Sequence, residues 1–139
     1  MASSDSLSNS SSLADWFDAV SHIIYYQPDD ALASKTFNER YSDDAVIKIN
    51  HGRFDKAKYW ELIKAARDVN HLAVQSNKEL HTWNAPDGLG GGCVAQLGYF
   101  TSTKKEDGTQ TVASSLTLTN VQVQDGKRVV VELTEIMKP

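Results

Sequence analysis

The sequence contains little cysteine and no excess of basic charge. Among its 139 residues there is a single cysteine, Cys93, and the formal net charge is −4. One cysteine excludes an intramolecular disulfide and is typical of a reducing compartment, so we expect a cytoplasmic protein. The acidic balance argues against nucleic-acid binding, which requires a basic surface. The four histidines are scattered without ligand spacing, so we expect no metal site.

Long apolar runs are also missing. No segment approaches the roughly 20 consecutive apolar residues of a membrane span, so we expect no membrane association. Residues 1–11 are small and polar and lack the basic and apolar regions of a signal peptide, so we expect them to form a disordered tail. The length of the remaining chain predicts a single domain over residues 12–139.

Three stretches have apolar residues at helical spacing, each preceded by a residue that can cap a helix. Ser12 precedes the first, which we expect to end before Pro28; Asp29 or Asp30 precedes the second, and Asp55 precedes the third. Strands are expected over residues 45–50 and 53–54, and a long, bulged strand over residues 70–84. The sequence does not determine which face of that long strand carries His71 and His81.

Residues 92–137 form three strand-like runs joined by the Asp107-Gly108 and Asp125-Gly126 turns. An Asp-Gly pair between alternating apolar runs is a strong hairpin signal. Two-residue turns would pair Leu116 with Glu135, and Leu118 with both Leu97 and Leu133. A four-residue loop at the first turn would slide the pairs by two residues and keep the faces.

These pairs predict two faces of the sheet. The more apolar face is the expected core, and it carries three polar side chains, Tyr99, Asn120 and Glu135, which would mark a pocket or a bonded network. The other face is rich in serine and threonine. It is expected to be the outer face of the sheet, through which two copies of the chain form a homodimer. Its expected contact residues are Gln96, Phe100, Thr117, Thr119 and Thr134.

Motifs within this order of elements resemble a known family. They are Tyr41 to Val46 (YSDDAV), Gly52 and Phe54 before the third helix, and Asp125-Gly126-Lys127 in the last hairpin. The sequence resembles the nuclear-transport-factor-2-like (NTF2-like) superfamily, and within it the SnoaL-like group of polyketide cyclase and ketosteroid isomerase relatives. The resemblance implies an α+β, cone-shaped fold in which three N-terminal helices pack on a strongly curved, mostly antiparallel sheet.

The resemblance also implies a pocket for a hydrophobic small molecule. The implied activity is a cofactor-independent isomerase, cyclase or dehydratase that transfers a proton on a polyketide- or terpenoid-like substrate; the alternative is a non-catalytic ligand-binding or dimerisation domain. The steroid-isomerase base would fall on Ile49, so it is missing, whereas Glu135 matches the acidic residue late on the last strand of SnoaL-like cyclases. Tyr99 or Asn120 would donate hydrogen bonds to the substrate, and His51 is the alternative acid-base residue. The expected pocket wall is Trp16, Val20, Tyr59, Ile63, Leu97, Leu116, Leu118 and Val131.

Overall fold

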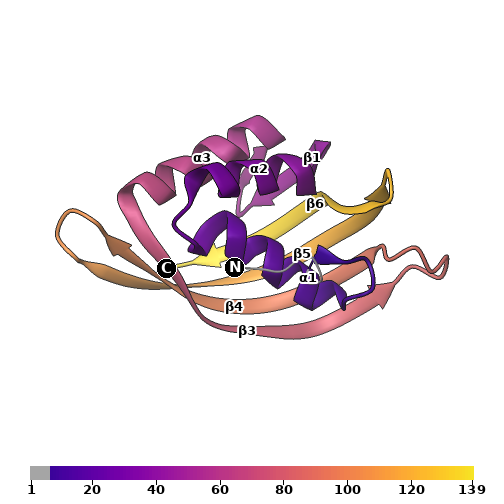
Figure 1. Cartoon of the computed structure of the whole chain (residues 1–139). Coiled ribbons are helices and arrows are strands. Elements are labelled where there is room, and N and C mark those ends of the chain that lie inside the picture. Colours follow the sequence, from indigo (N-terminus) through magenta and orange to yellow (C-terminus); the bar gives the residue numbers. More distant parts are fainter. Residues whose placement is uncertain (1–6) are drawn as a thin grey trace.

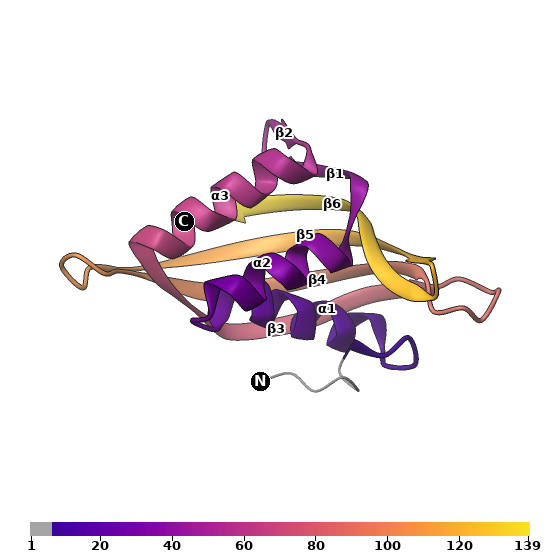
Figure 2. The same ribbon diagram turned by 45° about the horizontal axis from the view of Figure 1, so that its top comes forward.

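The computed structural model describes residues 7–139; the first six residues of the expected tail lie outside the described residues. The elements in order are α1 (Leu13–Ser21), the π-helical turn η2 (His22–Tyr26), α2 (Asp30–Arg40), β1 (Tyr41–Ile49), β2 (Gly52–Phe54), α3 (Lys56–Val69), β3 (Asn70–Asn84), β4 (Gly92–Lys104), β5 (Gln110–Gln124) and β6 (Lys127–Lys138). The strand order is β2-β1-β6-β5-β4-β3, with β1 parallel to β6 and the other neighbours antiparallel. The helices lie along one side of the curved sheet (Figures 1 and 2), which confirms the predicted α+β arrangement.

Each of the three α-helices begins at the capping residue that the sequence predicts. Ser12 Oγ accepts a hydrogen bond from the Asp15 amide at 3.1 Å, and Asp29 Oδ1 accepts one from the Leu32 amide at 3.1 Å. Asp55 Oδ1 accepts one from the Lys58 amide at 2.8 Å. Each cap satisfies an amide that has no partner within the helix, and so fixes where the helix starts.

The first helix does not keep its regular spacing up to Pro28. It changes at His22 into a π-helical turn, and the Gln27 amide donates to the His22 carbonyl at 3.1 Å, five residues back. A π-turn is wider than an α-helical turn, so the side chains after it point in directions that the α-helical period does not predict. Tyr25 and Tyr26 lie in this turn.

The two Asp-Gly turns set the register of the meander. Asp125 and Gly126 both have positive φ, 51° and 78°, as the predicted two-residue hairpin requires. The other turn is the four-residue alternative, closed by the Gly108 amide donating to the Lys104 carbonyl at 2.9 Å. Leu97 consequently pairs with Leu116 rather than Leu118, and the faces of β4 and β5 keep their alternation.

The predicted pairing of faces between β5 and β6 is wrong, because the last hairpin contains a β-bulge. Pairing shifts between Val121–Val130 and Asn120–Glu132, so Val131 is the extra residue. Beyond it Glu135 pairs with Thr117 instead of Leu116, because a shift of one residue moves a whole strand to the opposite face of its neighbour.

The side of the sheet under the helices is therefore the serine- and threonine-rich one. Val94, Gln96, Thr119 and Val121 are each at most 2% exposed, whereas Leu118 on the expected core face is 54% exposed. The correction has a physical cause: the large apolar residues of this core come from the helices and from β1 and β6. The buried cluster includes Trp16, Val20, Ile24, Ile47, Val130 and Leu133.

Candidate active site

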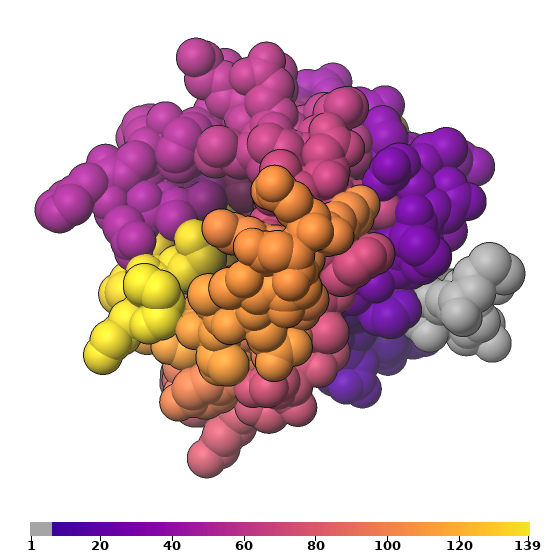
Figure 3. Space-filling view, turned by 90° about the vertical axis from the view of Figure 1, so that its left-hand side faces the viewer, coloured from indigo at the N-terminus to yellow at the C-terminus, as the bar shows by residue number. Residues whose placement is uncertain are grey.

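A cavity of about 660 Å³ lies between the helices and the inner face of the sheet. Figure 3 looks at the end of the molecule formed by the β4–β5 hairpin, α3 and the C-terminal strand. The wall is mainly apolar, with aromatic and aliphatic side chains from α1, η2, α3, β3 and β4. Of the described residues that line it, none is lysine or arginine, and two are carboxylic acids, Asp18 and Glu135.

Glu135 projects from β6 into this cavity. Ser115 Oγ, on the neighbouring strand, donates a hydrogen bond to Glu135 Oε2 at 2.6 Å. Burial raises the pKa of the Glu135 carboxyl, and the hydrogen bond from Ser115 lowers it by a smaller amount. A carboxylate that has lost much of its hydration, with no lysine or arginine among the described residues of the cavity wall, is a stronger base than one in water.

Two tyrosine hydroxyls meet in the same cavity. Tyr25 from η2 and Tyr59 from α3 hydrogen-bond to each other through their hydroxyl groups. Burial is the main cause that raises the pKa of both hydroxyls well above the ordinary tyrosine value, and the negative charge of Glu135 raises it further. Both are therefore protonated at neutral pH. One proton is used in the bond between them, which leaves the other free to bond to a ligand.

Tyr41 extends this cluster behind the cavity wall. It is 1% exposed, and within residues 7–139 its hydroxyl has no hydrogen-bond partner. Burial raises its pKa, the nearby Tyr25 hydroxyl lowers it by a smaller amount, and the charge of Glu135 raises it further. The charge of Glu135 thus acts on all three tyrosines, and their hydroxyl groups remain protonated.

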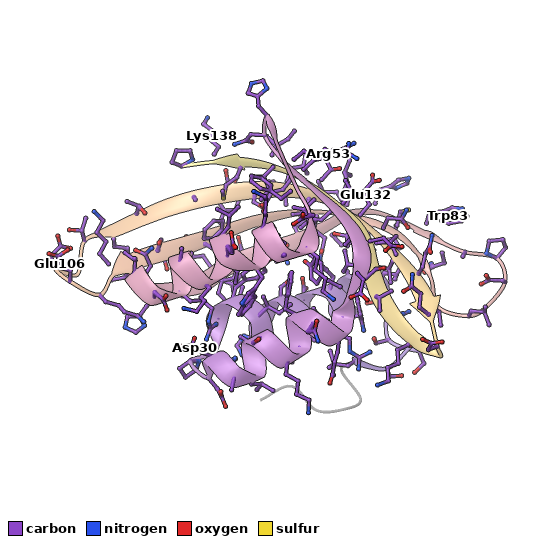
Figure 4. The ribbon with its side chains drawn as sticks, turned by 90° about the horizontal axis from the view of Figure 1, so that it is seen from above. Asp30, Arg53, Trp83, Glu106, Glu132 and Lys138 are labelled. Atoms are coloured by element: carbon purple, nitrogen blue, oxygen red, sulfur yellow. The ribbon has the colours of Figure 1, made fainter. Side chains whose placement is uncertain are left out.

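Arg67 holds the π-turn that carries Tyr25. Its Nη1 donates to the Ile24 carbonyl at 3.0 Å, and its Nη2 donates to the Gln27 carbonyl at 2.9 Å. Its Nε donates to Asp30 Oδ1 at 2.8 Å, at the start of α2 (Figure 4). Arg67 is 8% exposed, so this single side chain from α3 ties together η2 and α2 from within the protein.

Asp18 forms a second polar group in the cavity wall. Its Oδ1 accepts a hydrogen bond from Gln96 Nε2 at 3.0 Å and another from Asn77 Nδ2. Burial raises the pKa of Asp18 more than these two bonds lower it. Tyr26 lies close enough to both acids that, after burial, their charges contribute to raising its pKa to about 12.

Small residues of the sheet form the floor of the cavity between Glu135 and the strand residues that bind Asp18. Thr117 lies between Glu135 and Gln96 in the register of the sheet, and Gly98 lies between Ser115 and Asn77. A Cβ atom at Gly98 would find its nearest neighbour at 3.5 Å, so the glycine leaves space above the strand. The serine- and threonine-rich face is thus the floor of the cavity.

Only part of the predicted site lies in the cavity. Glu135, Tyr59 and Ile63 line it, and so does Ile49, as the apolar residue expected in place of the steroid-isomerase base. Trp16 and Val20 are fully buried in the core instead. Leu97, Leu116 and Leu118 face outward by register, and Val131 is the bulged residue.

The other three predicted catalytic residues are not grouped with Glu135. His51 is exposed in the turn between β1 and β2. Asn120 lines a separate groove of about 310 Å³ beside Trp83 and Glu132. Tyr99 borders the cavity but alternates with the inward Gly98 and Phe100, and it is 44% exposed.

Sequence reasoning missed Asp18, Tyr25 and Tyr26 as site residues. Helical periodicity assigns them to a face away from the apolar stripe, but part of the sheet curves under that side of the helix, and the π-turn redirects the two tyrosines. The signal in the sequence was the adjacent Tyr25-Tyr26 pair, which is unusual on a solvated helix face. His71 and His81, left unplaced above, are both exposed.

Metal-ligand clusters and membrane-spanning helices are both absent from the described part of the chain. Over residues 7–139 no group of three or more histidine, cysteine or acidic residues is arranged to hold a metal ion. Within the same residues, no helix has the length and apolar character needed to cross a membrane.

The fold and the cavity place the chain in a structural class. Its fold is shared with solved structures described as NTF2-like and SnoaL-like, and the predicted resemblance is confirmed at the level of the fold. No protein-family model and no curated protein sequence gives a significant match to the chain.

Solved structures supply the comparisons. A conserved protein from Planctomyces limnophilus superimposes with a TM-score of 0.70 at 10% identity, covering 89% of this chain and 88% of that one. A ketosteroid isomerase-like protein from Erwinia carotovora gives 0.61 at 15% identity, covering 81% and 84%. A SnoaL-like family protein from Agrobacterium tumefaciens gives 0.61 at 8% identity, covering 91% and 97%. At these identities the similarity defines the fold and not the activity.

Proposed function

We propose that the protein is an enzyme that transfers a proton next to the carbonyl group of a hydrophobic small molecule, with no cofactor. The observation that carries the proposal is the environment of Glu135. This carboxyl group lies in a mainly apolar cavity with no lysine or arginine among its described lining residues, and the protonated hydroxyls of Tyr25 and Tyr59 lie in the same cavity. Structural neighbours described as ketosteroid isomerase-like and SnoaL-like agree with this class of chemistry.

In the proposed reaction Glu135 is the general base. Its carboxylate takes a proton from the carbon next to the carbonyl, and the electron pair of that C–H bond moves onto the carbonyl oxygen to give an enolate. If the enolate is conjugated with a C=C bond, the protonated Glu135 returns the proton to the far carbon of that system, which yields an isomer. If the substrate carries a second carbonyl, the enolate carbon attacks it and closes a ring. If it carries a β-hydroxyl, that group takes the proton from Glu135 and leaves as water. The raised pKa of Glu135 suits this role at neutral pH.

The Tyr25–Tyr59 pair stabilises the enolate oxygen. The hydroxyl that is not donating to the other tyrosine donates to the oxygen on which negative charge develops. These two residues replace Tyr99 and Asn120 in the role of hydrogen-bond donors.

The cavity wall also limits the substrate. With two carboxylic acids and no lysine or arginine among its described lining residues, the cavity disfavours an anionic ligand. Its volume and mainly apolar wall suit a neutral molecule of about two or three fused rings. Polyketide- and terpenoid-like ketones fall in this class.

Proton exchange on a simple ketone tests the proposal without knowledge of the natural substrate. The probe is 2-tetralone, whose C1 protons lie between a carbonyl and an aromatic ring and are readily removed. In D₂O, wild-type protein should speed deuterium incorporation at C1, as measured by NMR. Glu135→Gln should lower the protein-dependent rate by about 10²-fold or more, with unchanged folding by circular dichroism. An unchanged rate would remove Glu135 as the base.

The outer face of the sheet supports a second proposal: two copies of the chain pair through it. Leu118 is 54% exposed and Ile136 61% exposed, and the register places them beside Leu97 and Leu116. An exposed apolar patch of this kind is typical of an interaction surface, and a two-fold axis would place the same patch on both copies. Of the contact residues expected from the sequence, Gln96, Phe100, Thr117 and Thr119 lie on the inner face, whereas Thr134 pairs with Leu118 and stays on the outer face.

Sedimentation tests the pairing. Wild-type protein should sediment as a dimer at micromolar concentration, and Leu118→Lys should weaken pairing at least about tenfold, because it buries a charge in each half of the interface. Thr111→Lys, at an exposed position of the same strand, is the matched control and should remain dimeric. A wild-type monomer would contradict the proposal.

A further inference from the structure

We propose that Asp18 binds a hydroxyl group at the end of the substrate opposite the reacting carbonyl. This inference rests on the proposed function, because it assigns the reacting end to Glu135. It adds a substrate class: a neutral, apolar ketone that carries a hydrogen-bond donor at its far end.

The register of the sheet places the two acidic groups at opposite sides of the cavity floor. Glu135 on β6 pairs with Thr117 on β5, and Thr117 pairs with Gln96 on β4, whose amide holds Asp18. Neighbouring strands lie about 4.8 Å apart, so the backbones at Glu135 and Gln96 are separated by about 10 Å. A ligand lying across Thr117 can reach both groups.

Asp18 is held in a way that leaves one of its oxygens for a ligand. Asn77 and Gln96 both donate to Oδ1, and within residues 7–139 no donor reaches Oδ2. The residue lines the cavity, so the second oxygen belongs to a group that a ligand can contact. A ligand hydroxyl that reaches this oxygen would take the place of water and donate a charge-assisted hydrogen bond.

The surroundings of Asp18 are rigid. Gln96 is 2% exposed, and its Oε1 has no partner among the described residues, so its amide is oriented by its bond to Asp18. Asn77 and Gln96 belong to β3 and β4, whereas Asp18 belongs to α1. The carboxyl group of Asp18 projects from the helix and is held by hydrogen bonds from two strands of the sheet. A binding group held in this way is preorganised.

The chemistry of this group selects a hydroxyl. An ether or ketone oxygen at the same place would face a carboxylate oxygen without a proton between them. An ammonium group would lose more hydration than a hydroxyl on entering a mainly apolar cavity. A neutral hydroxyl donates one charge-assisted hydrogen bond at a smaller cost of desolvation.

Two ketones that differ at one group test the inference: 6-hydroxy-2-tetralone and 6-methoxy-2-tetralone. Binding is measured by isothermal titration calorimetry, independently of any reaction. Wild-type protein should bind the hydroxyl probe about tenfold or more tightly than the methoxy probe, because only the hydroxyl can donate to the carboxylate.

Asp18→Asn should reduce this preference to about threefold or less. The asparagine carbonyl oxygen can still accept from Asn77 and Gln96, so its NH₂ group would face the ligand, where hydroxyl and methoxy oxygens both accept. Asp15→Asn is the matched control: it is exposed one turn earlier on the same helix, and it should keep the wild-type preference.

The inference is overturned if wild-type protein binds both probes equally, if neither probe binds, or if Asp18→Asn keeps the preference. Failure of the proposed base has a different signature. Should Glu135→Gln leave deuterium exchange unchanged while the hydroxyl preference still depends on Asp18, the role of Glu135 fails and the Asp18 site stands.

Discussion

Thr117 and Leu118 are neighbours on β5, and they contrast the two faces of the same sheet. Thr117 faces the helices and lines the cavity, whereas Leu118 faces outward and is 54% exposed. The usual expectation of apolar residues inside and polar residues outside is reversed at this point. The same reversal holds at the neighbouring pair, where Ser115 lies inside and Leu116 outside, but not at Asn120 and Val121, where the apolar residue is the buried one.

The difference shows that the inner face is built to leave space. Helices α1 and α3 supply large apolar side chains on one side of the cavity. The sheet contributes the small residues Ser115, Thr117 and Gly98 on the opposite side. A floor of large aliphatic residues would fill the cavity. On the outer face, apolar side chains are free to cover a partner, so each face has the composition that its proposed role requires.

The largest expected effect on stability comes from removing Arg67, which holds the π-turn that carries Tyr25 above the inner face of the sheet. Arg67→Met removes the donors to the Ile24 and Gln27 carbonyls and leaves Asp30 without its partner. We expect a loss of about 3 kcal/mol in the free energy of unfolding, measured by urea denaturation, because buried carbonyls would be left without donors.

Lys64→Met is the control for this variant. Lys64 lies on the same helix, and its ion pair with Asp68, at 3.2 Å, is exposed to solvent. Its loss should change the free energy of unfolding by no more than about 0.5 kcal/mol. Equal effects of the two substitutions would show that Arg67 does not hold the π-turn.

A smaller effect is expected in the pH dependence of stability, because only the inner face of the sheet carries a buried carboxyl group at Glu135. The pKa of Glu135 is raised in the folded protein, so folding favours its protonated form, and wild-type protein should lose stability as pH rises from about 4.5 through the raised value. Glu135→Gln lacks this loss, so its Tm should exceed that of wild type at pH 7.5 and approach it at pH 4. Each pKa unit corresponds to about 1.4 kcal/mol, or about 3–5 °C for a chain of this size. A Tm difference that stays the same from pH 4 to pH 7.5 would contradict the raised pKa.

Much of the fold could be predicted from local signals. The caps at Ser12, Asp29 and Asp55 and the turn at Asp125-Gly126 act over three or four residues, and the structure confirms each one. The order of these elements predicted the α+β arrangement, and the motifs at Tyr41 to Val46 and Asp125-Gly126-Lys127 carried the resemblance to the NTF2-like fold.

The site could be predicted only in part, because it depends on two local irregularities. The bulge at Val131 shifts the register of β6 against β5 by one residue, so the side chains that share a face change. No residue in the VVVE run marks which valine is extra. The π-turn at His22–Tyr26 changes the direction of Tyr25 and Tyr26. Glu135 was found because its inward position follows from its own strand, where it alternates with the buried Leu133.

The most direct test of the account compares two glutamates of β6 that lie on opposite faces. Glu135 faces the cavity, and the exposed Glu132, which pairs with Asn120, lies on the outer face. In the deuterium-exchange assay with 2-tetralone, Glu135→Gln should lose about 10²-fold or more of the protein-dependent rate, and Glu132→Gln should keep the wild-type rate. Equal rates for the two variants, or a loss only in Glu132→Gln, would contradict the assignment of the inner cavity as the active site.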